Sequence, residues 1–303
     1  MIKKNYFIFL LLVMAIPSIL HSQEIKIFEI EDFDLKGNVK SCRVITDYGK
    51  EEYHFDEDGR LTKAVTRYND TNYETTFYKY KNGELKEKRV ENYRDNRFDR
   101  GTSLANFYEI DTTDNRKVTE KIVSYTKELL EKNVYFYDEE EKLIKMVHTD
   151  TNGTDENIIE HTIGEKETTV ITTRNDDMVK SVHSSELDSL NKKIVTVNYL
   201  HGEPNAKTEE VFTSDKLLSS KDFSMDGSTQ KWNQEKEITY TYDEDGVLSQ
   251  TTTKMGAMIK TQEYIYQFDG TQYNNWVKEI ITPDNAYKTR RITYYEVPEI
   301  AKE

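Results

Sequence analysis

Apolar and polar residues alternate along most of the chain, a pattern typical of β-strands that bury one face. In residues 237–243 and 263–268, one face carries only aromatic or aliphatic side chains: Ile238, Tyr240, Tyr242, Tyr264, Tyr266 and Phe268. Residues 168–173 and 193–199 are rich in β-branched side chains, which suit a pleated surface. The pattern therefore predicts an all-β protein.

About twenty such runs follow one another, separated by short polar turns. Asn-Gly and Asp-Gly pairs mark many of the turns, and these residues tolerate the positive φ of tight hairpins. Short turns join antiparallel neighbours, whereas parallel strands need long crossovers. We therefore expect an antiparallel meander of stacked hairpins with little helix, forming one elongated, twisted or curled sheet.

The first 22 residues have the composition of a secretory signal peptide. Lys3 and Lys4 precede an apolar run over residues 6–16, and Ser22 is a small residue suited to cleavage. The run is shorter than the roughly 20 apolar residues that span a bilayer. We expect export to the periplasm, the outer-membrane surface or the extracellular space, with no membrane span after cleavage.

A degenerate repeat organises the remaining residues, 23–303. Two aromatic residues, an acidic turn and a leucine recur in residues 53–61, 78–85, 135–143 and 240–248, with a weaker copy in 264–270. The turn residues that we single out are Asp56, Gly59, Asn82, Gly83, Asp243, Gly246, Asp269 and Gly270. One hairpin cannot bury its apolar face alone, so neighbouring units must stack. The units form one β-meander domain or two lobes that meet near residues 150–190.

This motif resembles the YD repeat of RHS-type exported bacterial proteins, whose pattern is roughly Tyr-x-Tyr-Asp-x-x-Gly-x-Leu. Residues 240–248 match it fully, and residues 53–61 match it with one aromatic exchange. The third copy has Glu141 where the pattern has glycine. The C-terminal region also looks like that of many secreted proteins of the Bacteroidetes type. The resemblance implies a β-sheet protein with a binding or scaffolding role and no chemistry of its own.

Composition excludes several functional classes. The formal net charge of −14 and the isoelectric point near 5.1 are unlike those of nucleic-acid-binding proteins. A single cysteine, Cys42, cannot form an internal disulfide. Aromatic residues make up 12% of the chain, which indicates a packed fold rather than disorder.

No motif predicts a catalytic, metal or cofactor site. The acidic turns cannot fill an EF-type calcium shell, because position 12 of each loop, Val65 or Thr252, is not the bidentate glutamate that the shell needs. His54, His148, His161, His183 and His201 show no metal-ligand spacing. Ser184 and Ser185 follow His183 but lack the glycines of a nucleophile elbow. We therefore predict no cofactor, no metal and no enzymatic activity.

Aromatic rows are the remaining candidates for recognition. Core packing is the ordinary role of such rings, and a stacking platform for a glycan or a peptide is the functional alternative. The side chains that would form the platform are Tyr240, Tyr242, Tyr264, Tyr266 and Trp276.

The sequence thus favours an exported, non-enzymatic β-sheet protein that binds a protein or glycan partner, or acts as a scaffold, at the cell envelope. Two alternatives stay open. One is an envelope polysaccharide hydrolase that uses two sheet carboxylates in a cleft. The other is an immunity or inhibitor protein whose negative charge meets a basic surface toxin.

Overall fold

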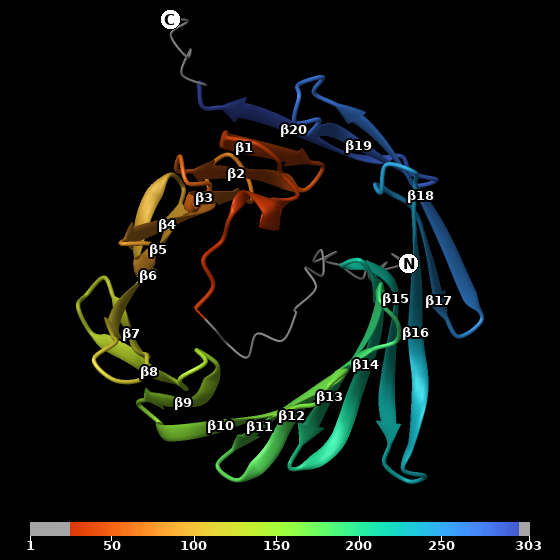
Figure 1. Ribbon diagram of the computed structural model, residues 1–303. Helices are drawn as coiled ribbons and strands as arrows, with labels where there is room; N and C mark the ends of the chain where they lie inside the picture. Colours follow the sequence, from red (N-terminus) through yellow and green to blue (C-terminus); the bar gives the residue numbers. More distant parts are fainter. Residues whose placement is uncertain (1–24, 297–303) are drawn as a thin grey trace, which may run out of the picture.

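A computed structural model describes residues 25–296, which form an all-β structure (Figure 1). Twenty strands belong to a single sheet, and a four-residue 3₁₀ helix, η1 (Ile30–Phe33), precedes them. The predictions of an all-β class, about twenty strands and little helix are confirmed for these residues. None of the helices in residues 25–296 has the length and hydropathy of a transmembrane helix.

Most strands contain 7 to 12 residues and are joined by short turns. The first ten are β1 (Val39–Thr46), β2 (Gly49–Phe55), β3 (Leu61–Arg67), β4 (Tyr73–Lys81), β5 (Glu84–Arg94), β6 (Arg97–Asp111), β7 (Lys117–Ser124), β8 (Leu129–Tyr137), β9 (Leu143–Asp150) and β10 (Gly153–Ile163). The second ten are β11 (Glu167–Arg174), β12 (Asp177–Glu186), β13 (Asn191–Leu200), β14 (Glu203–Thr213), β15 (Lys216–Asp226), β16 (Lys231–Tyr242), β17 (Leu248–Met255), β18 (Met258–Phe268), β19 (Trp276–Thr282) and β20 (Ala286–Tyr294).

The sheet closes on itself, because β20 pairs with β1. Every strand is antiparallel to the next along the chain, and the closing pair runs from Val39 opposite Tyr294 to Ile45 opposite Thr289. The prediction of one elongated, twisted or curled sheet is therefore wrong in its outline, because the sheet is a closed barrel (Figure 1). Closure gives the backbone N–H and C=O groups of β1 and β20 hydrogen-bond partners that an open edge would lack.

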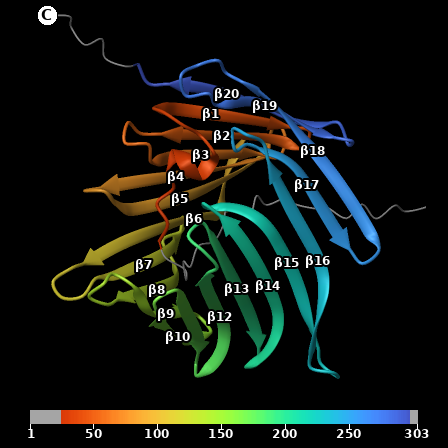
Figure 2. The same cartoon turned by 45° about the vertical axis from the view of Figure 1, so that its right-hand side comes forward.

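An up-and-down barrel separates its turns into two sets. Turns that follow even-numbered strands lie at one rim, and turns that follow odd-numbered strands lie at the other (Figure 2). All the predicted repeat turns follow β2, β4, β8, β16 or β18, so they share one rim, which we call the repeat rim. We call the other the far rim.

Helix η1 identifies the inner face of the barrel wall. Residues 25–36 run inside the ring of strands (Figure 1). The Phe33 ring lies 4.4 Å from the ring of Tyr53 and 5.4 Å from that of Phe55, measured between centroids. Tyr53 and Phe55 of β2 therefore point inward, and Glu52 and His54 point outward. Residues directly opposite each other on paired strands share a face, so the register shows which side chains of the other strands point inward.

Three clusters of buried side chains line the inner wall. The largest lies on β5–β11 and packs against Ile25 and Ile27. The second joins Ile30 and Leu35 to residues of β1–β3, and the third lies on β12–β14. The N-terminal segment thus fills part of the interior and packs apolar side chains against the first half of the wall.

Two sequence-based expectations concern the extent of the domain. The signal peptide of residues 1–22 lies outside the described residues. Residues 150–190, where two lobes would meet, fall mainly in β10, β11 and β12. These strands pair continuously with β9 on one side and β13 on the other.

A buried carboxylate, Glu120 of β7, organises the largest cluster. It accepts hydrogen bonds from Nδ2 of Asn106 and Asn133 at 2.7 and 3.0 Å, and from the hydroxyls of Tyr108 and Tyr135 at 2.8 and 2.9 Å. Burial acts to raise the pKa of Glu120, but the four donors outweigh burial and hold the pKa below its ordinary value. The carboxylate is therefore charged in the folded protein and fully hydrogen-bonded.

We expect Glu120→Gln to destabilise the fold by about 1–3 kcal/mol at pH 7, because the amide cannot accept all four bonds. Glu120 has a lowered pKa, so its contribution is present above the ordinary value of 4.5 and is lost as the pH falls through the folded-state pKa. Urea unfolding at pH 7 and at decreasing pH below 4.5 should show a smaller acid-induced loss in Glu120→Gln than in the wild type. Glu109→Gln, on the outer face of β6, is the control, and an equal acid response in all three proteins would contradict the assignment.

Candidate functional site

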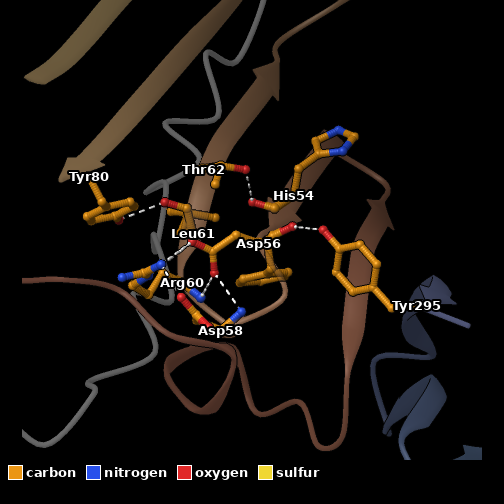
Figure 3. Close-up of polar contacts among 9 residues, drawn as sticks. His54, Asp56, Asp58, Arg60, Leu61, Thr62, Tyr80 and Tyr295 are labelled. Atoms are coloured by element: carbon orange, nitrogen blue, oxygen red, sulfur yellow. Dashed lines mark hydrogen bonds and ion pairs between the residues drawn. The ribbon is translucent and has the colours of Figure 1, made fainter. Parts of the chain in front are cut away.

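Three of the repeat turns share one geometry, seen for the first copy in Figure 3. Asp56, Asp138 and Asp243 each accept a backbone hydrogen bond from the residue three positions later, at 3.0, 3.1 and 3.0 Å. Each carboxylate also accepts from the N–H four positions later, at 2.9, 2.9 and 2.7 Å. The aspartate therefore satisfies the turn's own N–H groups, which is a structural role.

Positive φ angles occur where the repeat predicts them. They are 85° at Gly59, 55° at Asn82, 80° at Gly83, 76° at Gly246 and 71° at Gly270. Glu141, at the position that lacks the repeat glycine, still adopts a φ of 59°. The third unit thus keeps the turn in spite of the steric cost of a side chain in this region.

The second tyrosine of a unit ties that unit to the preceding hairpin. The Tyr80 hydroxyl donates to the carbonyl of Leu61 at 2.7 Å, and the Arg60 guanidinium lies 5.2 Å from the centroid of the Tyr80 ring (Figure 3). Tyr242 repeats the arrangement with the Leu217 carbonyl at 2.9 Å and Lys216 over its ring at 5.5 Å. The second tyrosine of the repeat therefore helps to hold neighbouring hairpins together along the repeat rim.

The predicted recognition aromatics all belong to the inner wall. Tyr240 and Tyr242 lie on β16, and Tyr264 and Tyr266 lie on β18, with β17 between the two pairs. The four tyrosines are half-buried, and burial raises the pKa of Tyr240 to about 12. Trp276 is buried, and its ring centroid is 5.9 Å from that of Tyr266.

Trp276 serves to hold the N-terminal segment. Its Nε1 donates to Oδ2 of Asp34 at 2.7 Å. The Arg290 guanidinium lies 3.4 Å from the centroid of the Trp276 ring and donates to the carbonyls of Phe33 and Asp34 at 2.9 and 3.0 Å. Burial lowers the pKa of Arg290, although Cys42 and nearby acids act in the other direction. We call Asp34, Trp276 and Arg290 the plug lock.

Contacts of the same segment lie on both sides of the closing β1–β20 pair. Nδ2 of the buried Asn275 donates to the Lys36 carbonyl at 2.8 Å, and the Lys36 N–H donates to Asn275 Oδ1 at 2.8 Å. On the β2–β3 side, Ile30 N–H donates to the Gly59 carbonyl at 3.0 Å and Leu61 N–H donates to the Phe28 carbonyl at 2.8 Å. Residues 28–36 therefore bridge the strands that flank the seam.

A pocket of about 370 Å³ lies at the far rim, between the β3–β4 and β5–β6 turns. Its lining residues are Tyr68, Asn69, Asn72, Tyr73, Asn92, Tyr93, Arg94 and Thr102. Sequence reasoning missed this site, because it followed the repeat motif, whose turns lie at the other rim. The pocket lining contains no Asp or Glu, so it offers no carboxylate pair for the hydrolase alternative.

An aromatic column begins at this pocket and continues along the outer wall. Tyr73 and Tyr93 stack with centroids 4.5 Å apart at an interplanar angle of 10°. Phe98 lies 5.8 Å from Tyr93, and Tyr125 lies 5.0 Å from Phe98. The sequence of β4 could have indicated this column, because the strand has aromatic residues on both faces. Tyr73 and Phe77 lie on one face, and Tyr78 and Tyr80 lie on the other.

The histidine and cysteine side chains do not form a reactive group. Among residues 25–296, no three or more His, Cys, Asp or Glu side chains are grouped so as to hold a metal ion. His54 and His183 lie on the outer wall, while His148 and His161 lie on the inner wall. Burial raises the pKa of the Cys42 thiol to about 11, with Arg290 acting to lower it, so Cys42 is an unreactive apolar side chain.

No protein-family model matches the sequence, and comparison with curated proteins finds no match. Among solved structures, a porin-like protein from Bacteroides uniformis is similar at 9% identity and a TM-score of 0.33, over 84% of this chain and 96% of that one. A porin-like protein from Bacteroides vulgatus gives 9% identity and a TM-score of 0.25, over 86% and 99%. The TcdB2-TccC3-TEV structure gives 9% and 0.14, over 77% and 18%. At these TM-scores the similarities support no inference about function.

We expect Arg290→Leu to destabilise the fold by about 3 kcal/mol, because it leaves the Phe33 and Asp34 carbonyls without their donor. Hydrogen exchange in residues 25–36 should accelerate in this variant. Arg291→Leu is the matched control, because Arg291 points outward and is exposed. Equal exchange rates in the two variants would show that the plug lock does not hold the segment.

Glu141→Gly should stabilise the protein by about 0.5–1 kcal/mol, since glycine removes the steric cost of a side chain at φ 59°. Glu140→Gly, one residue earlier, should bring no gain. Thermal unfolding of the two variants measures the difference, and a loss of stability in Glu141→Gly would refute the assignment of Glu141 to the repeat-glycine position.

Proposed function

We propose that the chain is an exported, non-enzymatic β-barrel whose outer wall faces water and which binds a glycan or protein partner at the cell envelope. One observation carries the proposal, namely the ion pairs that join neighbouring strands on the outer wall. A barrel embedded in lipid carries an apolar outer band about 25 Å tall instead.

The ion pairs recur at intervals around the ring. Nε of Arg43 on β1 is 3.1 Å from Oε1 of Glu52 on β2. Further round the ring, Glu209 of β14 lies between Lys193 of β13 and Lys207 of its own strand, with N–O distances of 2.8 and 2.5 Å.

Other strands carry the same kind of outward contact. They include Lys79–Glu87 (3.0 Å), Lys121–Glu109 (2.6 Å), Lys145–Glu156 (2.6 Å) and Lys221–Glu237 (3.3 Å). A Lys or Arg facing lipid at mid-bilayer costs about 2–4 kcal/mol, so a wall with so many is suited to water.

The interior supports a binding or scaffolding role rather than conduction. Residues 25–36 occupy part of the ring and are fixed to its wall by Asn275 and the plug lock. The pocket at the far rim offers aromatic rings, amides and one guanidinium, which are groups that bind ligands rather than activate them.

Kinship with the YD-repeat proteins is part of the same proposal. The shared Asp turn and the tyrosine that reaches the preceding hairpin support it. The four half-buried tyrosines of β16 and β18 remain a second candidate surface for the partner, in which Tyr240 is the side chain to test first.

Phase separation tests the proposal. The full chain would be produced in a Gram-negative host, and the exported protein would be extracted with Triton X-114 beside a known outer-membrane barrel as a control. We expect this protein in the aqueous phase, released from the envelope without detergent. Its recovery in the detergent phase, together with the control barrel, would overturn the proposal.

A further inference from the structure

We infer that the far-rim pocket binds a short, uncharged, hydroxyl-rich glycan. The inference rests on the proposed function only in requiring that this rim be open to water. The polarity of the outer wall implies neither the far-rim pocket as a binding site nor a glycan as its ligand.

The pocket is preformed, because hydrogen bonds lock the two turns that build it. Asn69 Oδ1 accepts from the N–H groups of Thr71 and Asn72, at 2.9 and 2.7 Å. Asn72 Oδ1 accepts from the N–H of Asp95 at 3.0 Å, and the Asn96 N–H donates to the Thr71 carbonyl at 2.8 Å. A ligand would therefore meet ordered walls, which reduces the entropic cost of binding.

The same bonds determine what the pocket can offer. They occupy the side-chain oxygens of Asn69 and Asn72, and they leave the two Nδ2 groups as donors. Asn92 Nδ2 is already bound to the Thr102 carbonyl at 2.8 Å. The free amide donors suit hydroxyl oxygens, which accept hydrogen bonds without carrying charge.

Aromatic rings in the pocket supply the second kind of contact with a sugar. Arg67 lies over one side of the Tyr73 ring, 4.6 Å from the centroid, and Tyr93 covers the other. The faces of Tyr73 are therefore occupied, and it forms a fixed wall. Tyr68 is 62% exposed and lines the same pocket, so its ring is the one available to lie against a sugar.

Charge argues against the other small-ligand classes. No acidic side chain lines the pocket, so a cation has no counter-charge there. Nε of Arg94, the one basic lining residue, is 3.1 Å from Oδ2 of Asp99, which compensates the charge available to an anion. An uncharged ligand that carries many hydroxyl groups fits this balance best.

The test is a binding measurement with purified protein and a panel of uncharged mono- and disaccharides, with matched uronic acids, inorganic phosphate and dipeptides as competing classes. We expect saturable binding of at least one uncharged saccharide, with amide shifts at Asn69, Asn72 and Tyr93. Tyr68→Ala should weaken it about tenfold or more, whereas Tyr287→Ala should leave it unchanged. Tyr287 is the matched control because it is 49% exposed and lies on the outer wall of β20.

The outcomes separate this inference from the proposed function. Binding of only charged probes, binding unaffected by Tyr68→Ala in a variant of unchanged melting temperature, or no saccharide binding at millimolar concentration would each overturn the glycan site. A protein that stays in the aqueous phase but binds no saccharide would refute the inference alone. Recovery in the detergent phase would instead refute the proposed function.

Discussion

The antiparallel pairing of β20 with β1 is the contact on which the rest of the structure depends. It joins residues about 250 positions apart, so its formation carries the loop-closure cost of nearly the whole chain. Residues 28–36 reinforce it by bonding to the β2–β3 hairpin on one side and to Asn275 and Arg290 on the other. Without this seam, the first and last strands would each present an unpaired edge.

Local features of the fold could be read from the sequence, because they depend on neighbouring residues. Alternation located the strands, and the Asp-x-x-Gly spacing located the turns at Gly59 and Gly246 with their positive φ. Closure could not be read, since a terminal strand has the same alternation whether its outer edge is free or paired. The overall outline of the molecule was therefore the part that the sequence predicted wrongly.

The candidate site was beyond sequence reasoning for a related reason. Alternation separates two faces of a strand, but it does not say which face is inside when both carry aromatic residues. Trp276 was predicted as a recognition residue, whereas its indole contacts Asp34 and Arg290 of the same chain. Tyr68 lies in a turn, outside any alternating run, and only the meeting of two turns makes it part of a pocket.

The even number of strands has a consequence for how the barrel can be attached to other structures. Since β20 ends at the repeat rim, a group joined after β20 approaches the barrel from that side. A group attached there would hold the barrel by its repeat rim and leave Tyr68 at the opposite rim, directed away from the point of attachment.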